Sequence, residues 1–150
     1  MRLPGRRDAR DRGSITLMLL ALFVALIALA GIVIDGGAKL DQAENANAIA
    51  QEAARAGAGM VNQATAYASG TFTVDPGQAV AAARQYLANN GYDPADGYTA
   101  TVTPVGNDSI RVTVTVTGHT KVLSIIGINR MTSTGTATAS LVTGVTGPGR

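Results

Sequence analysis

The chain has 150 residues, a length that suits one modest domain plus one additional element. It contains no cysteine, which excludes disulfides, thiolate metal sites and a cysteine nucleophile. Hydrophobic residues make up 46% of the chain but aromatic residues only 4%, so we expect a thin core of small side chains.

The charges are segregated along the chain. Residues 1–12 hold five arginines and two aspartates, which leaves 12 − 5 = 7 basic and 10 − 2 = 8 acidic residues elsewhere. No basic patch is interleaved with aromatic residues, so we expect no nucleic-acid partner. A basic segment before an apolar run is instead a topology signal. The sequence therefore predicts a cytoplasmic basic tail over residues 1–14.

An uncharged apolar run extends from Ile15 to Ile34, which is 20 residues. A helix of that length covers about 30 Å, the thickness of the hydrocarbon layer of a bilayer. The run has no polar residue except Thr16, whereas a soluble core helix would carry a polar stripe. Because arginines precede the run and Asp35 follows it, we expect a single-pass transmembrane helix over 15–34. Its N-terminus is expected in the cytoplasm and the remaining chain outside.

A cleaved signal peptide is the competing interpretation of this run. Ala28-Leu29-Ala30 has the A-x-A pattern of a cleavage site, which makes Ala30 a possible processing site. The apolar character continues beyond Ala30 to Ile34, and this favours a retained anchor. Both interpretations export the rest of the chain.

Residues 35–68 are rich in alanine and predict an extracytoplasmic helix, best formed from Ala38 to about Ala56 and able to continue to about Ala68. Small residues recur at alternating steps of three and four, which is the spacing of a helix-packing stripe. We call this stripe the alanine seam; its members are Ala43, Ala46, Ala50, Ala53, Gly57 and Met60. Such a seam can pack on the protein's own sheet or on neighbouring copies and partner helices, and the two alternatives are not exclusive.

Residues 69–142 predict a small α+β domain. Asp75 followed by Pro76 is a helix start, and the helix should end at about Asn89, before Gly91, with Val80, Ala83 and Leu87 on one face. Alternation of apolar residues with threonine predicts strands over 98–103, 109–117 and 136–141, with a hairpin turn at 106–108. The segment 120–127 reads as one or two helical turns, and residues 143–150 as a disordered tail.

Residues capable of chemistry are few. His119 is the one histidine and lies in a predicted turn, where a surface role is expected. Asp93 and Asp96 could offer oxygen atoms to calcium, but their spacing does not fit a calcium-binding loop. No nucleophile elbow, phosphate loop or zinc motif occurs. We therefore expect no enzyme activity, cofactor, metal or small-molecule substrate.

Three stretches carry a resemblance to a known family: "RDRGSITLMLLALFVALIALAGIVIDGG", "AENANAIAQEAARAGA" and, more loosely, "GTATASL". They resemble the TadE/TadG-like family of tight-adherence (Flp-type) pilus assembly proteins, in an actinobacterial style, with the best agreement over residues 10–59. The resemblance implies a pilin- or pseudopilin-like α+β fold with one membrane helix. It also implies a minor pilin or assembly factor of the cell envelope whose partners are the membrane and other pilus or secretion proteins, met through the alanine-rich helix.

One residue departs from the pilin pattern. Members of pilin-like families that are cut by a prepilin peptidase carry glutamate at the fifth position after the cleaved glycine. If Gly13 were that glycine, the fifth residue would be Met18. An unprocessed, TadG-like anchor is thus the better match, although Gly13 stays a possible processing site. The alternative function is a small exported binding or adhesin-like module held at the cell surface.

Overall fold

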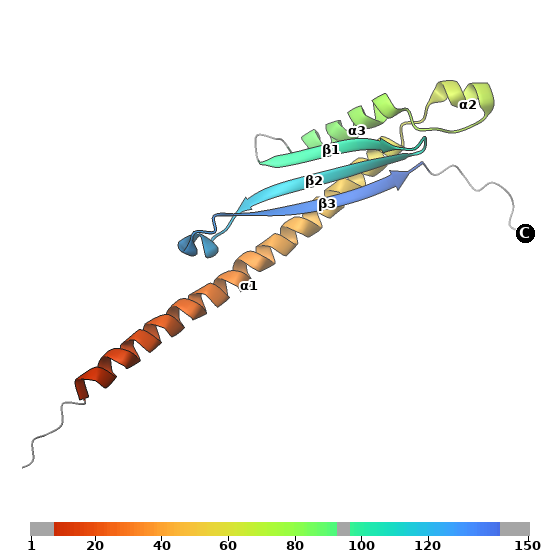
Figure 1. Ribbon diagram of the computed structural model, residues 1–150. Helices are drawn as coiled ribbons and strands as arrows, with labels where there is room; N and C mark the ends of the chain where they lie inside the picture. Colours follow the sequence, from red (N-terminus) through yellow and green to blue (C-terminus); the bar gives the residue numbers. More distant parts are fainter. Residues whose placement is uncertain (1–7, 93–96, 142–150) are drawn as a thin grey trace, which may run out of the picture. The chain divides into compact units, whose positions relative to one another are not determined.

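A computed structural model describes residues 8–92 and 97–141 (Figure 1). Residues 1–7 of the basic tail, the pair Asp93 and Asp96, and the predicted disordered tail lie outside the described residues. The chain divides into two compact units. The first unit contains residues up to Ala38 together with His119–Arg130, and the second contains Lys39–Gly118 and residues from Met131 onward. The elements confirm the predicted α+β class.

The first element, α1, is a 51-residue helix over Asp8–Ala58. It contains the whole apolar run and most of the alanine-rich segment, and it passes through Gly36 and Gly37 without a break. The predicted continuation to about Ala68 is wrong. The helix ends between Gly57 and Gly59, because glycine weakens a helix. At this point the Met60 N–H donates to the Gly57 carbonyl.

A separate short helix, α2 (Gln63–Ser69), follows. Asn62 is its N-cap, and its side-chain oxygen accepts a hydrogen bond from the Thr65 N–H at 3.2 Å. The Asn62 N–H itself donates to the Thr73 carbonyl at 2.8 Å, and this bond joins the two ends of the segment that contains α2. A residue engaged in this way cannot continue α1, because its backbone is extended.

The next helix, α3 (Pro76–Asn89), has the predicted bounds. The Asp75 side chain caps it by accepting from the N–H groups of Gly77 and Gln78 at 2.9 and 3.0 Å. Gly91 follows with φ 77°, the left-handed conformation that glycine adopts most readily. Ala83 and Leu87 are buried as predicted, whereas the third buried residue is Ala79, and Val80 is only half-buried.

The sheet contains β1 (Tyr98–Val105), β2 (Ser109–His119) and β3 (Arg130–Ser140), in that spatial order. β1 and β2 are antiparallel, with Val102 opposite Val112. All three predicted strands are present, and β3 begins six residues earlier than expected. Between β2 and β3 a single 3₁₀ turn, η2 (Leu123–Ile126), accounts for the predicted helical turn.

The threonine-rich face of the sheet pairs across β2 and β3. The hydroxyl groups of Thr113 and Thr136 lie 3.1 Å apart, and those of Thr115 and Thr134 lie 3.3 Å apart. Such cross-strand pairs stabilise a sheet modestly, by roughly 0.2–1 kcal/mol each. These threonine pairs therefore favour one register of β3 against β2, and they leave this face of the sheet polar.

The opposite face of the sheet carries the core of the second unit. Ile110, Val112 and Val114 of β2 are fully buried, and alanines of α1 and α3 pack against them. Figure 1 shows α3 and the part of α1 that belongs to the second unit lying along this same face. The close approach depends on glycine: a Cβ atom added to Gly135 of β3 would overlap the backbone of Ala46 and Asn47 in α1. The expected thin core is therefore a consequence of short distances between backbones.

Candidate functional site

The apolar part of α1 presents large aliphatic side chains outward. Leu17, Phe23 and Val33 are among those left exposed, and the run has almost no buried residue. Within the described residues, α1 is the one helix long and apolar enough to cross a membrane. An exposed apolar patch of this size marks an interaction surface, because water disfavours it. The predicted span is thus present as a candidate.

Asp35 follows the apolar run on α1, yet its side chain is only 3% exposed. Its carboxylate accepts three backbone hydrogen bonds from the first unit's second segment. Oδ1 accepts from the Lys121 N–H at 2.8 Å, and Oδ2 accepts from Val122 and Leu123 at 3.0 and 2.6 Å. We call this arrangement the Asp35 clamp. It fastens the segment His119–Arg130, which we call the distal loop, to α1.

The distal loop needs this clamp because it cannot cap its own 3₁₀ turn. The N-cap position of η2 is Val122, whose side chain makes no capping bond. The carboxylate of Asp35 therefore supplies the acceptor that a local serine or aspartate would otherwise provide. A charged residue that follows an apolar run would be expected to face water, but Asp35 is buried. The missing local cap was the signal that could have indicated a distant acceptor.

Gly31 lies one helical turn before Asp35 and completes the contact. A Cβ atom at Gly31 would stand 2.9 Å from Leu123 Cδ2 and 3.2 Å from Val122 Cγ1. Contacts under 3.0 Å require the neighbour to move, so glycine is the residue that lets the distal loop lie against α1. Gly31 and Leu123 are both buried as a result.

Exchanging Asp35 for asparagine removes the charge that the three amides share. We expect amide hydrogen exchange at Lys121, Val122 and Leu123 to become about tenfold faster or more, since bonds to charged groups are the stronger ones. Asp41→Asn, an exposed aspartate on the same helix, is the matched control and should leave these rates unchanged. Unaltered exchange in Asp35→Asn would contradict the clamp.

The clamp also has a defined pH dependence. The hydrogen bond from Leu123, joined by those from Lys121 and Val122, holds the pKa of Asp35 below its ordinary value although burial opposes this. A carboxyl whose pKa is lower in the folded state stabilises the fold fully above its unfolded pKa of about 3.9. Its contribution disappears as the pH falls through the lower folded value. At neutral pH the carboxylate of Asp35 is charged and the clamp should protect the Leu123 N–H from exchange. This protection should be lost only in strong acid, where the carboxylate becomes protonated.

The alanine seam lies inside the second unit. Ala46, Ala50, Ala53 and Gly57 are buried, whereas Ala43 and Met60 are half-buried. A Cβ atom on Gly57 would stand 2.9 Å from the Ala79 carbonyl oxygen and 3.3 Å from Ile110 Cγ2. The seam thus packs on the protein's own sheet and on α3, the first of the two predicted alternatives, and these side chains are covered. The spacing did not reveal that Ala54 and Ala58 are buried beside them.

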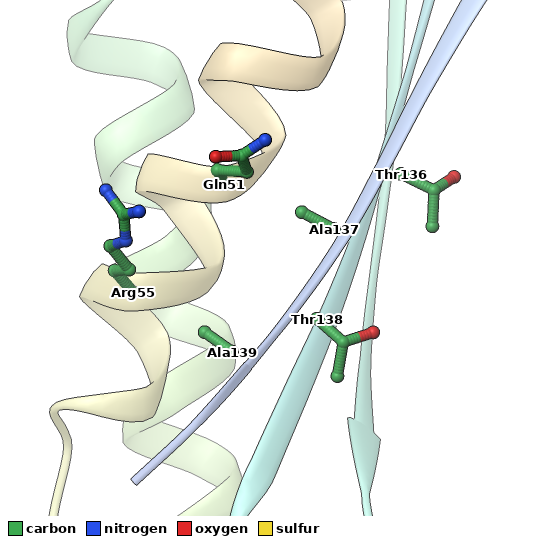
Figure 2. A pocket seen from close by; sticks show the side chains of 6 residues that line it. All are labelled: Gln51, Arg55, Thr136, Ala137, Thr138 and Ala139. Atoms are coloured by element: carbon green, nitrogen blue, oxygen red, sulfur yellow. The ribbon is translucent and has the colours of Figure 1, made fainter. Parts of the chain in front are cut away.

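A shallow hollow of about 320 Å³ lies between α1 and the edge strand β3 (Figure 2). Gln51 and Arg55 come from α1, and in Figure 2 Ala137 and Ala139 point toward that helix while the neighbouring threonines point away. Arg55 is paired with Glu52 on the surface of α1. The Asn47 side-chain oxygen accepts from the Thr136 N–H at 3.1 Å, so a helix side chain engages the strand edge. The hollow offers one cation and one amide but no group poised for a reaction.

The remaining candidates stay isolated. His119 ends β2 and is exposed. Within residues 8–92 and 97–141, no three histidine, aspartate or glutamate side chains gather as metal ligands would. Gly13 and Ala30, the possible processing positions, both lie within α1.

The fold and these contacts define an α+β protein that begins with one long apolar helix. Its candidate functional features are packing contacts. Residues 13–62, which are 50 of the 150, match the family model for Tad, described as "Putative Flp pilus-assembly TadE/G-like". This confirms the resemblance predicted from the sequence and supports a pilus-related assembly role. Searches of curated proteins and of solved structures found no match.

Proposed function

We propose that the protein is a membrane-anchored structural or assembly component of a tight-adherence pilus or a related secretion system, minor-pilin-like or pseudopilin-like in kind. The observation that carries this proposal is the position of the family match. Residues 13–62 cover the apolar run, Asp35 and the buried seam, and they end at the cap of α2. The matched segment is therefore mostly the long helix α1, with its apolar run and its buried seam.

In this proposal the membrane helix comprises residues 15–34, with 1–14 as a cytoplasmic tail and the chain from Asp35 onward outside. The exposure of the apolar side chains supports the span, and the arginines before it support the orientation. Residues 35–68 and 69–142 are proposed as the helical and α+β parts of the extracytoplasmic region, and 143–150 as its tail. The helical part includes the break between α1 and α2.

The proposal keeps the N-terminal helix in the mature protein. Sequencing of the purified protein's N-terminus should give Met1 or Arg2. A start at Ser14 would indicate prepilin-type processing after Gly13, and a start at Gly31 would indicate signal cleavage after Ala30. Met18 and the apolar residues beyond Ala30 are the reasons for expecting neither.

The proposed contact with other pilus or secretion proteins uses the exposed face of the alanine-rich helix. The seam cannot serve it while it is covered by the sheet, so residues such as Ala48 and Gln51, which are exposed, take that place. A photo-crosslinking residue placed at Ala48 in cells should capture pilus or secretion components, identified by mass spectrometry. The same residue at Ala50, which is fully buried, is the matched control and should capture none.

Deletion of the gene tests the function as a whole. We expect loss of assembled pili or of the secreted product of the system, with rescue by the unaltered chain. Intact pili after deletion, together with capture of no pilus or secretion component at Ala48, would refute the proposal and favour the exported binding module.

A further inference from the structure

The distal loop leaves three isoleucines uncovered. Ile125 is 73% exposed, Ile126 50% and Ile128 46%, although the loop has only twelve residues. The same segment contains His119, Lys121 and Arg130, all exposed, and no acidic residue. Apolar side chains combined with basic ones, without acids, are the composition of segments that bind membrane interfaces.

The loop is held in one conformation. Thr120 closes it by donating its N–H to the Asn129 carbonyl at 3.2 Å and its hydroxyl to the Ile128 carbonyl. The Ile128 N–H donates to the Leu123 carbonyl at 3.1 Å, and Gly127 turns the chain with φ 91°. The isoleucines are thus exposed by a closed and clamped backbone, so their exposure is a property of the fold.

The contact with Gly31 fixes the position of the distal loop along the axis of α1. Val122 and Leu123 contact Gly31, which lies within the uncharged run and four residues before Asp35. Four residues of helix correspond to about 6 Å along the axis. If Ile15–Ile34 spans a bilayer, the loop therefore begins at the boundary of the hydrocarbon layer.

We propose that the distal loop is a second membrane contact, lying in the bilayer interface beside the helix that spans it, with Ile125, Ile126 and Ile128 among the acyl chains. Lys121 and Arg130 then lie at the level of the lipid phosphates, where each basic residue contributes about 1 kcal/mol on an anionic surface. This inference rests on the proposed membrane anchor, and it adds a role for residues outside the family match.

The composition favours lipid over a protein partner as the occupant. The isoleucines are exposed on a loop that is fastened to α1 near the end of the Ile15–Ile34 run, and the loop carries no acid that an anionic headgroup would repel. The clamp also satisfies the N–H groups at the start of the 3₁₀ turn, because Asp35 accepts hydrogen bonds from them. These groups therefore need no hydrogen bond from lipid or water. Exposed apolar side chains together with basic residues and no acid favour a lipid surface.

Single cysteines offer a clean test because the natural chain has none. The full chain would be reconstituted in phosphatidylcholine–phosphatidylglycerol vesicles with a fluorophore on Ile126→Cys, and quenched either by bromine-labelled acyl chains or by aqueous iodide. We expect strong quenching by the brominated lipid and at least about fivefold protection from iodide relative to Thr138→Cys. Thr138 is exposed on the threonine face and serves as the aqueous control. Val24→Cys, in the middle of the apolar run, is the lipid control.

The outcomes separate this inference from the anchor itself. Quenching of Val24→Cys by lipid and of Ile126→Cys by iodide alone would overturn the interfacial loop and leave the anchor intact. Quenching of Val24→Cys by iodide would instead remove the anchor. Protection of Ile126→Cys from both quenchers would mean that protein covers the loop, and a dependence of that protection on the protein-to-lipid ratio would identify a second copy. As an independent check, Asp35→Asn should make the Ile126→Cys signal partly aqueous, because it loosens the clamp.

Discussion

Gly135→Val is expected to destabilise the second unit by about 3 kcal/mol, the upper part of the range for overpacked cores. A Cβ atom at this position would overlap the backbone of Ala46 and Asn47, and backbone atoms of a helix cannot turn aside as a flexible side chain can. β3 and α1 must therefore separate, which uncovers the alanines between them. Urea denaturation of the full chain in detergent micelles would measure the loss as a lower midpoint.

Gly37→Ala is the matched control for this substitution. No heavy atom lies within 4 Å of a Cβ placed there, and the residue is in the interior of α1. Alanine in that position should be neutral or stabilising by about 0.5–1 kcal/mol. Gly135→Ala should fall between the two. An unchanged midpoint for Gly135→Val would show that the close helix–sheet distance is not what this glycine provides.

Leu26→Arg is expected to release the chain from the membrane fraction or block its insertion. An arginine near the centre of a membrane helix costs about 3 kcal/mol on insertion scales, which shifts the partition by roughly 100-fold. Leu26 is 55% exposed, so little packing within the protein is lost by the change. Carbonate extraction of cell membranes, followed by immunoblotting, measures the fraction retained.

Leu40→Arg makes the same chemical change outside the apolar run. Leu40 is also exposed and lies on α1 beyond Asp35, so membrane retention should be unaffected. Equal retention of both variants would argue that residues 15–34 do not enter the hydrocarbon layer.

Elements with local signals were predictable from the sequence. The bounds of α3 follow from Asp75, Pro76 and Gly91, whose roles depend on neighbours within three residues. The strands follow from the alternation of valine with threonine, since one face is buried and the other is wet. The end of α1 was predicted less well, because Gly57 and Gly59 weaken a helix without fixing which of them ends it.

Contacts between distant segments were not predictable in the same way. The spacing of the alanine seam indicated that the stripe packs closely, but small residues suit a sheet as well as a second helix. The deciding residue is Gly135, which lies 85 positions beyond Ala50 of the seam and has no signal of its own. The Asp35 clamp joins residues 86 to 88 positions apart. The only sign of it in the sequence is a 3₁₀ turn that lacks a local capping residue.

The bond from Thr136 to Asn47 has a consequence for how copies of the protein coexist. An unpaired strand edge is a template on which another chain can add, and continuous sheets grow by that route. Here the amide at the middle of β3 is already committed to a side chain of α1. A second chain that adds to this edge would have to displace that bond, so β3 is a poorer template at its middle.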